Sequence, residues 1–286
     1  MSIEVQGLSC VYSEGTAFEK RALDDIHLTI ADGEFLGIIG HTGSGKSTLI
    51  QHFNALMKPT AGKVLVDGED IHADKSKLKS VRQKIGLVFQ YPEHQLFEMT
   101  VYKDVAFGPE NLGLPKDEVE NRVREATKLV GIPAEMLEKS PFELSGGQKR
   151  RVAIAGVLAM HPRVLVLDEP AAGLDPRGRD EILQSVKEMH ATLGITVVLV
   201  SHSMEDIAKL VDRIIVMNKG RIAITGSPAD VFGQARRLEE MGLAAPQAAY
   251  LLDALRGKGF NIPEGLFTTD AAAGAILQAL DSEARA

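Results

Sequence analysis

The sequence predicts an α/β fold in which helices cover both faces of a mostly parallel sheet. Helix-like and strand-like segments alternate in its second half: helices are predicted over residues 148–160 and 180–192, and strands over 163–167 and 195–200. This alternation is typical of parallel strands that helical crossovers connect. The strands are also nearly unbroken apolar runs, as expected where both faces of a sheet are buried.

The amino-terminal part of the chain predicts antiparallel strands beside the parallel ones. Residues 3–8 and 23–30 alternate between apolar and polar side chains, which is typical of strands with one solvated face. Two further short strands are expected over residues 63–66 and 85–89. Residues 3–8 and 23–30 therefore predict an antiparallel β subdomain.

A glycine-rich segment stands between an apolar strand at residues 35–39 and a helical segment at 47–56. It matches the P-loop pattern, in which glycines let backbone N–H groups close around phosphates at the N-terminus of a helix. Lys46 is expected to reach the β- and γ-phosphates, and the Ser47 hydroxyl to coordinate Mg²⁺. The predicted nucleotide-binding residues of the loop are Gly40, His41, Thr42, Gly43, Ser44, Gly45, Lys46, Ser47 and Thr48.

Residues 101–144 differ from the segments around them because they contain few β-branched runs. Within them, residues 116–130 predict a charged amphipathic helix. We therefore expect a helical insertion over about residues 91–160. Further on, strand-like residues 214–217 and 221–225 flank Asn-Lys-Gly, which predicts a hairpin.

A short motif, LSGGQ, predicts a second phosphate-binding surface in the same chain. Ser145 is a good N-cap, and Gly146 and Gly147 leave backbone N–H groups bare at the start of the next helix. A plain helix cap would have the same residues. Because one nucleotide cannot easily use both surfaces, we expect two protomers to enclose ATP between them. The motif consists of Leu144, Ser145, Gly146, Gly147 and Gln148.

Two carboxylates follow the apolar run at residues 164–167. The carboxyl end of a central parallel strand opens onto the ligand crevice, so Asp168 can hold Mg²⁺ directly or through water. Glu169 can orient or deprotonate the attacking water. Beside a P-loop, this pair favours ATP hydrolysis over an exposed acidic turn.

Together these motifs resemble the ATP-binding cassette (ABC) ATPases, a family of P-loop NTPases, over about residues 3–230. The resemblance implies an ABC ATPase domain over residues 1–230 and a C-terminal helical tail over 231–286. All catalytic motifs are complete, which argues against a regulatory cassette that only binds nucleotide. Ala171-Ala172 departs from the family pattern, in which many relatives carry a hydroxyl-bearing residue, but the departure touches none of the catalytic roles.

The resemblance assigns further roles by position. Gln90 looks like the Q-loop glutamine that contacts Mg²⁺ and the attacking water, and His202 looks like the switch histidine at the γ-phosphate. Asp175 looks like the D-loop aspartate that reaches across the dimer. Tyr12 is the expected aromatic residue that stacks on adenine, and Phe18 is its rival.

Two segments look more narrowly like the energy-coupling-factor (ECF) transporter ATPases, which drive uptake of vitamins and transition-metal ions. They are residues 90–101 (QYPEHQLFEMTV) and 104–109 (DVAFGP), while residues 15–19 (GTAFE) resemble the second of two paired ATPase subunits. The resemblance implies a peripheral subunit at the cytoplasmic face of the cell membrane. Its implied partners are a second ABC ATPase subunit, in a homodimer or heterodimer, a transmembrane T component and a substrate-binding S component.

Two acids and the tail carry hypotheses about these partners. In the ECF family, arginines of the T component enter the groove behind the Q-loop, and Glu93 and Glu98 are their hypothesised partners here; solvated loop acids are the alternative. The family's tail pairs the two ATPase subunits. Pro246 stands near a helix start, and Thr-Thr-Asp at 268–270 can cap the last helix. An apolar stripe can face a partner or pack on its own domain; it consists of Leu243, Ala248, Leu251, Leu252 and Leu255.

Composition narrows the function further. The net charge of −7 does not favour nucleic acid as a partner, and the one cysteine, Cys10, fits a reducing compartment. The sequence shows no signal peptide and nothing near the roughly 18 apolar residues of a membrane span, so transport requires membrane partners. The alternatives are an ordinary ABC importer subunit and a soluble ABC ATPase of DNA repair or translation. The latter usually carry two cassettes or long coiled insertions.

Overall fold

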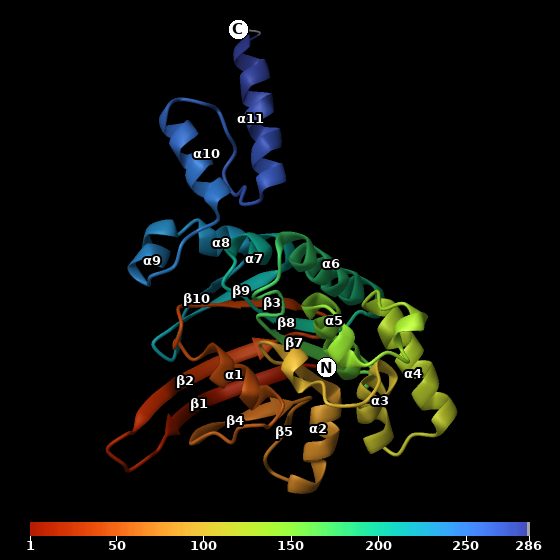
Figure 1. Ribbon diagram of the computed structural model, residues 1–286. Helices are drawn as coiled ribbons and strands as arrows, with labels where there is room; N and C mark the ends of the chain where they lie inside the picture. Colours follow the sequence, from red (N-terminus) through yellow and green to blue (C-terminus); the bar gives the residue numbers. More distant parts are fainter. Residues whose placement is uncertain (285–286) are drawn as a thin grey trace.

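Two sheets form the body of the protein in a computed structural model, which describes residues 1–284 (Figure 1). The larger sheet has the strand order β10-β9-β3-β8-β7-β6, and every neighbouring pair except β10–β9 is parallel. Its strands are β3 (Phe35–Ile39), β6 (Ile85–Val88), β7 (Val164–Asp168), β8 (Thr196–Val200), β9 (Arg213–Asn218) and β10 (Arg221–Gly226). The predicted mostly parallel sheet is confirmed.

The central strands are hydrophobic because both of their faces are covered. Every residue of β3, β6, β7 and β8 is buried. Successive side chains of a strand point to opposite faces, so Val197 and Leu199 enter one hydrophobic core, and Val198 and Val200 enter the other. The first core lies against α3–α7, and the second lies against α1 and the smaller sheet.

The helices of the body alternate with these strands. They are α1 (Lys46–Phe53), α2 (Leu78–Lys84), α3 (Val101–Asn111), α4 (Lys116–Leu129), α5 (Gly146–Leu158), α6 (Pro176–Leu193) and α7 (Met204–Leu210), with short 3₁₀ turns η1 (Lys75–Lys77), η2 (Pro92–Gln95), η3 (Ala134–Met136) and η4 (Pro141–Glu143). The predicted helix at 180–192 begins earlier, because the Asp175 side chain caps the first turn and Pro176 occupies its first position. The predicted helical insertion contains α3 and α4.

The smaller sheet is antiparallel, as predicted, with the order β2-β1-β4-β5. Its strands are β1 (Ile3–Tyr12), β2 (Lys20–Ile30), β4 (Ala61–Val66) and β5 (Glu69–Asp70). The first two strands are longer than expected. The register of β1 shifts between Val5 and Val11, and these irregularities interrupt the apolar–polar alternation on which the prediction relied.

The predicted hairpin joins β9 to β10. Arg221 pairs with Asn218, which leaves Lys219 and Gly220 as the two turn residues. Their φ angles of 48° and 78° belong to the left-handed region that two-residue hairpin turns require. Gly220 also donates its backbone N–H to Ser44 O of the P-loop, so the hairpin braces the loop.

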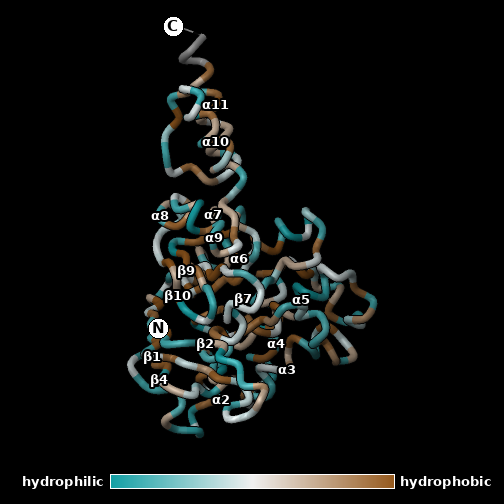
Figure 2. Tube along the Cα trace, turned by 90° about the vertical axis from the view of Figure 1, so that its left-hand side faces the viewer, coloured by the Kyte–Doolittle hydropathy of each residue, from teal (hydrophilic) through white to brown (hydrophobic). Residues whose placement is uncertain are grey.

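In the described residues the C-terminal part of the chain forms four helices, of which the last two project from the body in both views (Figures 1 and 2). The four helices are α8 (Pro228–Phe232), α9 (Ala235–Glu240), α10 (Gln247–Gly257) and α11 (Thr269–Ala284). Pro246 precedes α10, and Thr268 accepts a hydrogen bond from Ala271 N at the start of α11, as predicted. No helix in the described residues is long and apolar enough to cross a membrane.

The tail divides into a part that packs on the body and a part that packs on itself. Phe232 and Leu238 belong to the main core, whereas Leu252 and Ile262 belong to a small separate core with α11. The apolar stripe divides in the same way, because Leu243 packs against the main core while most of the rest lies in or against the small one. The domain boundary at residue 230 stays a prediction, and the self-packed part of the tail begins with α10.

Candidate active site

The P-loop closes tightly on itself between β3 and α1. Gly45 has φ +106°, and a Cβ there would lie 2.7 Å from Ala22 O and 2.9 Å from a Leu23 methyl carbon. Only glycine combines that backbone with that space. The Ser44 hydroxyl is buried without a hydrogen-bond partner among the described residues. An unpartnered buried hydroxyl in a loop of bare N–H groups fits a bound phosphate.

The Lys46 ammonium is held inside this loop. Its Nζ donates to Gly40 O at 2.6 Å and to His41 O at 3.1 Å. Burial lowers the pKa of Lys46, while Glu169 and Asp168 oppose that shift. The ammonium is thus pre-positioned at the loop mouth and lacks the hydration that it would have on the surface.

Asp168 ends β7 opposite Ser47. Burial raises the pKa of the Asp168 carboxyl, against the opposing effects of the Ser47 hydroxyl, which donates to it, and of Lys46. A hydroxyl and a carboxylate are oxygen donors of the type that Mg²⁺ takes together with substrate phosphates. The pair therefore fits the predicted metal site.

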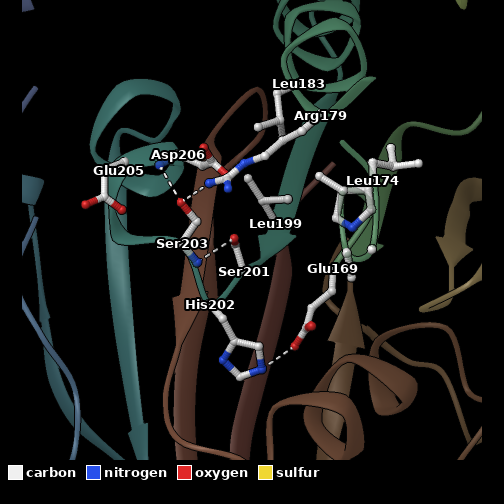
Figure 3. Close-up of a pocket in the computed structure, with 14 residues that line it drawn as sticks. Glu169, Leu174, Arg179, Leu183, Leu199, Ser201, His202, Ser203, Glu205 and Asp206 are labelled. Carbon is white, nitrogen blue, oxygen red and sulfur yellow. Dashed lines mark hydrogen bonds and ion pairs between the residues drawn. The ribbon is translucent and has the colours of Figure 1, made fainter. Parts of the chain in front are cut away.

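Glu169 lies at the centre of the site with φ +52°, a strained angle for a residue other than glycine. Its Oε1 is 2.6 Å from His202 Nε2 (Figure 3). Its Oε2 accepts from Gln90 Nε2 at 3.1 Å. Burial raises the pKa of Glu169, and His202 opposes that shift. Three side chains that were expected to act together therefore lie within contact distance.

Tyr12, at the end of β1, lines a cavity together with the P-loop, Glu169 and His202. Its hydroxyl is 3.1 Å from Thr48 Oγ1, and the cavity has a volume of about 280 Å³. Phe18 is instead 85% exposed, in the turn between β1 and β2. This geometry favours Tyr12 as the adenine-stacking residue. Lys20 also lines the cavity, and sequence reasoning missed it because only the strand pairing of the folded chain brings it opposite Tyr12.

The LSGGQ turn opens to solvent rather than toward its own P-loop. Ser145 caps α5: its hydroxyl accepts from Gln148 N, and Gln148 Oε1 accepts from Ser145 N. Ser145 and Gly146 are exposed, and a Cβ at Gly146 or Gly147 would meet nothing within 4 Å. Leu144 is buried and anchors the turn. The turn is both a helix cap and an accessible surface.

Asp175 is exposed and accepts from Gly178 N at 2.9 Å, as the cap of α6. One turn later, Arg179 donates to Asp206 Oδ2 and to Ser203 Oγ, at the edge of a cavity of about 440 Å³ that also includes His202 (Figure 3). Sequence reasoning missed this link between the two loops, because its members are far apart along the chain.

The two acids assigned to a membrane partner have different surroundings. Glu93 forms a two-pronged ion pair with the buried Arg150 of its own chain. The backbone N–H of Glu98 donates to Asp104 Oδ1, and its neighbours Phe97 and Met99 are exposed. Glu93 is therefore neither a free docking acid nor a solvated one.

Comparison with known proteins places this arrangement in context. Residues 23–172 match the family described as ABC transporter. The energy-coupling factor transporter ATP-binding protein EcfA2 of Clostridium tetani is 54% identical over 99% of both chains. That of Acetivibrio thermocellus is 57% identical over 94% of this chain and 95% of the relative.

Two solved structures share the fold. CbiO1 of Clostridium perfringens, described as part of the ABC transporter complex cbiONQ, has a TM-score of 0.75 at 42% identity and covers 88% of this chain and 98% of its own. The ATP-binding cassette MJ0796, a dimer in a post-hydrolysis state with ADP and Pi, has a TM-score of 0.71 at 31% identity over 79% of this chain and 98% of its own.

Proposed function

The chain belongs to the ABC transporter family, as an ATP-binding subunit of the energy-coupling-factor type, and from this premise we propose how its residues turn over ATP. The observation that carries the proposal is the position of Glu169. Its carboxylate is held between Gln90 and His202, next to the strand residue Asp168 and the loop residue Lys46. These are the groups that a γ-phosphate and an attacking water require around them.

The P-loop binds the triphosphate, and Tyr12 stacks on the adenine. The backbone N–H groups and Lys46 hold the β- and γ-phosphates, and Ser44 gains a partner for its buried hydroxyl. Ser47, Asp168 and Gln90 are the residues that would hold Mg²⁺, which supplies neutralisation of phosphate charge when bound. The preformed charges of the site stabilise the transition state with little rearrangement.

Glu169 acts as the general base or orients the attacking water. A base works best when its pKa is near the operating pH, and burial moves the pKa of Glu169 in that direction. In the nucleotide-free protein, His202 and Gln90 hold the carboxylate of Glu169 on the phosphate side of the cavity. A bound nucleotide would compete for His202 and Gln90, so nucleotide binding is expected to rearrange their contacts with Glu169.

Two protomers share each ATP. The LSGGQ turn presents bare N–H groups at the start of α5, and the open space at Gly146 and Gly147 admits a phosphate from outside the chain. ATP therefore closes the dimer, and hydrolysis removes the shared phosphate and reopens it. Asp175 is exposed and reaches the other subunit.

The proposed membrane partners are a transmembrane T component and a substrate-binding S component, which this chain meets at the cytoplasmic face of the membrane, and the cargo is a vitamin or a transition-metal ion. Two kinds of relative support this: the proteins named for energy-coupling factor transporters, and the structure described as part of a cbiONQ complex. The exposed side chains of Phe97 and Met99, with Glu98 between them, offer a mixed apolar and acidic docking surface for the T component. Glu93 is excluded from that surface by its internal partner.

The Glu169→Gln variant tests the proposed chemistry. Turnover of ATP is expected to fall by about 10²–10⁴, the scale of a missing general base. Binding of ATP should persist, because the P-loop contacts remain, and size-exclusion chromatography with ATP should show a longer-lived dimer. A matched control is Glu120→Gln, since Glu120 is an exposed acid of α4 that pairs with Arg124 on the same helix. Wild-type turnover in the Glu169 variant would contradict the role of that residue.

A further inference from the structure

Arg150 is the largest fully buried side chain of the body and is absent from the proposed chemistry. It lies in the second turn of α5, the helix that the LSGGQ turn begins, and it is 1% exposed. A buried guanidinium is costly unless its N–H groups are satisfied. The partners of Arg150 therefore indicate why the charge is retained.

Those partners come from two other segments of the chain. Nε and Nη2 donate to the two carboxylate oxygens of Glu93 at 3.0 and 2.7 Å, which is a two-pronged pair. Nη1 donates to Pro170 O at 3.0 Å and to Ala172 O at 2.6 Å. The Tyr91 ring lies 5.9 Å from the guanidinium carbon, close enough for a cation–π contact.

These contacts join three segments that the proposed function assigns to different tasks. Tyr91 and Glu93 directly follow Gln90. Pro170 directly follows Glu169 and leads to the Asp175 loop. The third segment is the LSGGQ turn itself, through α5. The guanidinium of Arg150 thus links the segments that follow Gln90 and Glu169 to α5. In the proposed dimer, the first turn of α5 faces the nucleotide of the partner.

We propose that Arg150 and Glu93 are a positioning pair that couples the two ATP sites of the dimer. The inference rests on the proposed function and deepens it. When the partner's phosphate engages the LSGGQ turn of one protomer, α5 moves with Arg150, and Arg150 carries the loops of Gln90 and Glu169 of the same protomer. Each chain thereby adjusts its own catalytic glutamate according to the nucleotide that it completes in its neighbour.

The geometry favours coupling over simple stabilisation. A buried ion pair gives little net stability compared with apolar residues of the same volume, so stability alone does not account for it. The planar guanidinium of Arg150 fixes the direction of its hydrogen bonds as well as their length. Both carbonyl partners and the carboxylate partner lie within a few residues of catalytic positions, although Arg150 itself touches none of the catalytic side chains identified above.

The test uses the full chain assembled in its proposed membrane transporter complex. Glu93→Gln keeps the shape of the side chain and removes the charge, and Glu93→Asp keeps the carboxylate. Glu120→Gln breaks an exposed Arg–Glu pair on α4 and is the matched control. For Glu93→Gln, kcat is expected to fall about tenfold with KM for ATP unchanged, because small displacements of catalytic groups cost up to about 10²-fold. Glu93→Asp should recover part of the loss.

Hydrogen exchange on the nucleotide-free full chain gives a second readout that does not depend on turnover. In Glu93→Gln, exchange is expected to rise together in residues 91–95, 146–150 and 170–174, and to stay unchanged there in Glu120→Gln. A rise confined to 91–95, or equal kcat for the two variants, would overturn the coupling. A wild-type complex without ATP turnover would overturn the proposed function instead, and the exchange pattern would still decide the role of the pair.

Discussion

Two regions of the molecule differ in what they bury. The P-loop edge of the parallel sheet buries charged side chains, whereas the self-packed helices of the tail expose apolar ones. At the sheet edge, Lys46 and Asp168 are each only 6% exposed, and burial opposes the charge of both. In the tail, Leu251 and Leu277 are 51% and 63% exposed. Buried charge and exposed apolar surface are both unfavourable in an isolated chain.

The difference teaches what each region lacks. A triphosphate with its cation would supply the charge and hydrogen bonds that the sheet edge has prepared. An apolar surface would cover the leucines of the tail, where we propose that a second ATPase subunit binds. We therefore propose that a nucleotide covers the P-loop edge of the sheet and that a second protein subunit covers the tail. The predictions below separate these two needs.

Among the variants that separate these two needs, Gly146→Asp is expected to have the largest effect. A Cβ at Gly146 meets nothing within 4 Å, so its own fold tolerates the change, but a carboxylate there repels the partner's γ-phosphate. Turnover should fall by about 10²–10³, as when a transition-state donor is lost, with ATP binding at the P-loop retained. Asn121→Asp in α4 is the control, because it adds a carboxylate at an exposed position outside both the LSGGQ turn and the tail. Equal ATPase rates in the two variants would place the nucleotide contact elsewhere.

Core truncations should show that the two regions unfold separately. Leu199 and Leu252 are both fully buried, one in β8 and the other in the small tail core. Leu199→Ala should lower the free energy of unfolding of the body by about 2–5 kcal/mol. Leu252→Ala should loosen α10 and α11 and leave the main thermal transition in place. A single transition lowered equally by both substitutions would show that tail and body form one cooperative unit.

Association should depend on the exposed leucines of the tail. Leu277→Glu is expected to raise the dissociation constant of the ATPase pair about tenfold, since one apolar side chain contributes roughly 1.5 kcal/mol on burial. Sedimentation measures the constant. Leu193→Glu is the matched control, because Leu193 is an exposed leucine at the end of α6, outside the tail. Equal effects of the two variants would remove the tail from the interface.

The smallest effect concerns the stability of the nucleotide-free protein. The pKa of Glu169 is raised above its ordinary 4.5 by burial, so the folded state holds that proton more tightly than the unfolded state does. Stability from this group is therefore present at low pH and is lost as the pH rises through the folded pKa. Glu169→Gln should raise the free energy of unfolding at neutral pH, and this gain should vanish below about pH 4.5. Denaturant titrations across pH measure it; a gain that grows on acidification would contradict the assigned direction.

How far the sequence predicts this molecule depends on distance along the chain. The P-loop, the LSGGQ turn and the Asp168–Glu169 strand end are local patterns, and the structure places each on the expected strand or helix. Contacts between distant segments were missed. Arg150 pairs with Glu93 across 57 residues, and nothing near either residue marks the pair. The apolar stripe of the tail could not be divided between inside and outside, because its helical spacing suits both.

The same limit explains why Glu93 was assigned to a membrane partner. In the sequence, Glu93 is an acid in a polar loop, and the family resemblance suggests an arginine of the T component as its partner. Only the folded chain brings Arg150 next to it. Glu98, next to exposed Phe97 and Met99, keeps the docking role as a proposal. The longer β1, whose register shifts obscured its alternation, likewise brought Tyr12 to the P-loop rather than leaving it in a loop.

The central claim is that one triphosphate is bound by two polypeptides. The most direct test is the structure of the Glu169→Gln chain in its assembled complex with ATP and Mg²⁺, in which the groups around the γ-phosphate at Lys46 can be identified. We predict that Ser145 and the adjacent N–H groups, or the matching turn of a second ATPase subunit, lie within about 3 Å of that phosphate and come from another polypeptide. A closed, nucleotide-bound site whose γ-phosphate is contacted by its own chain alone would contradict the account.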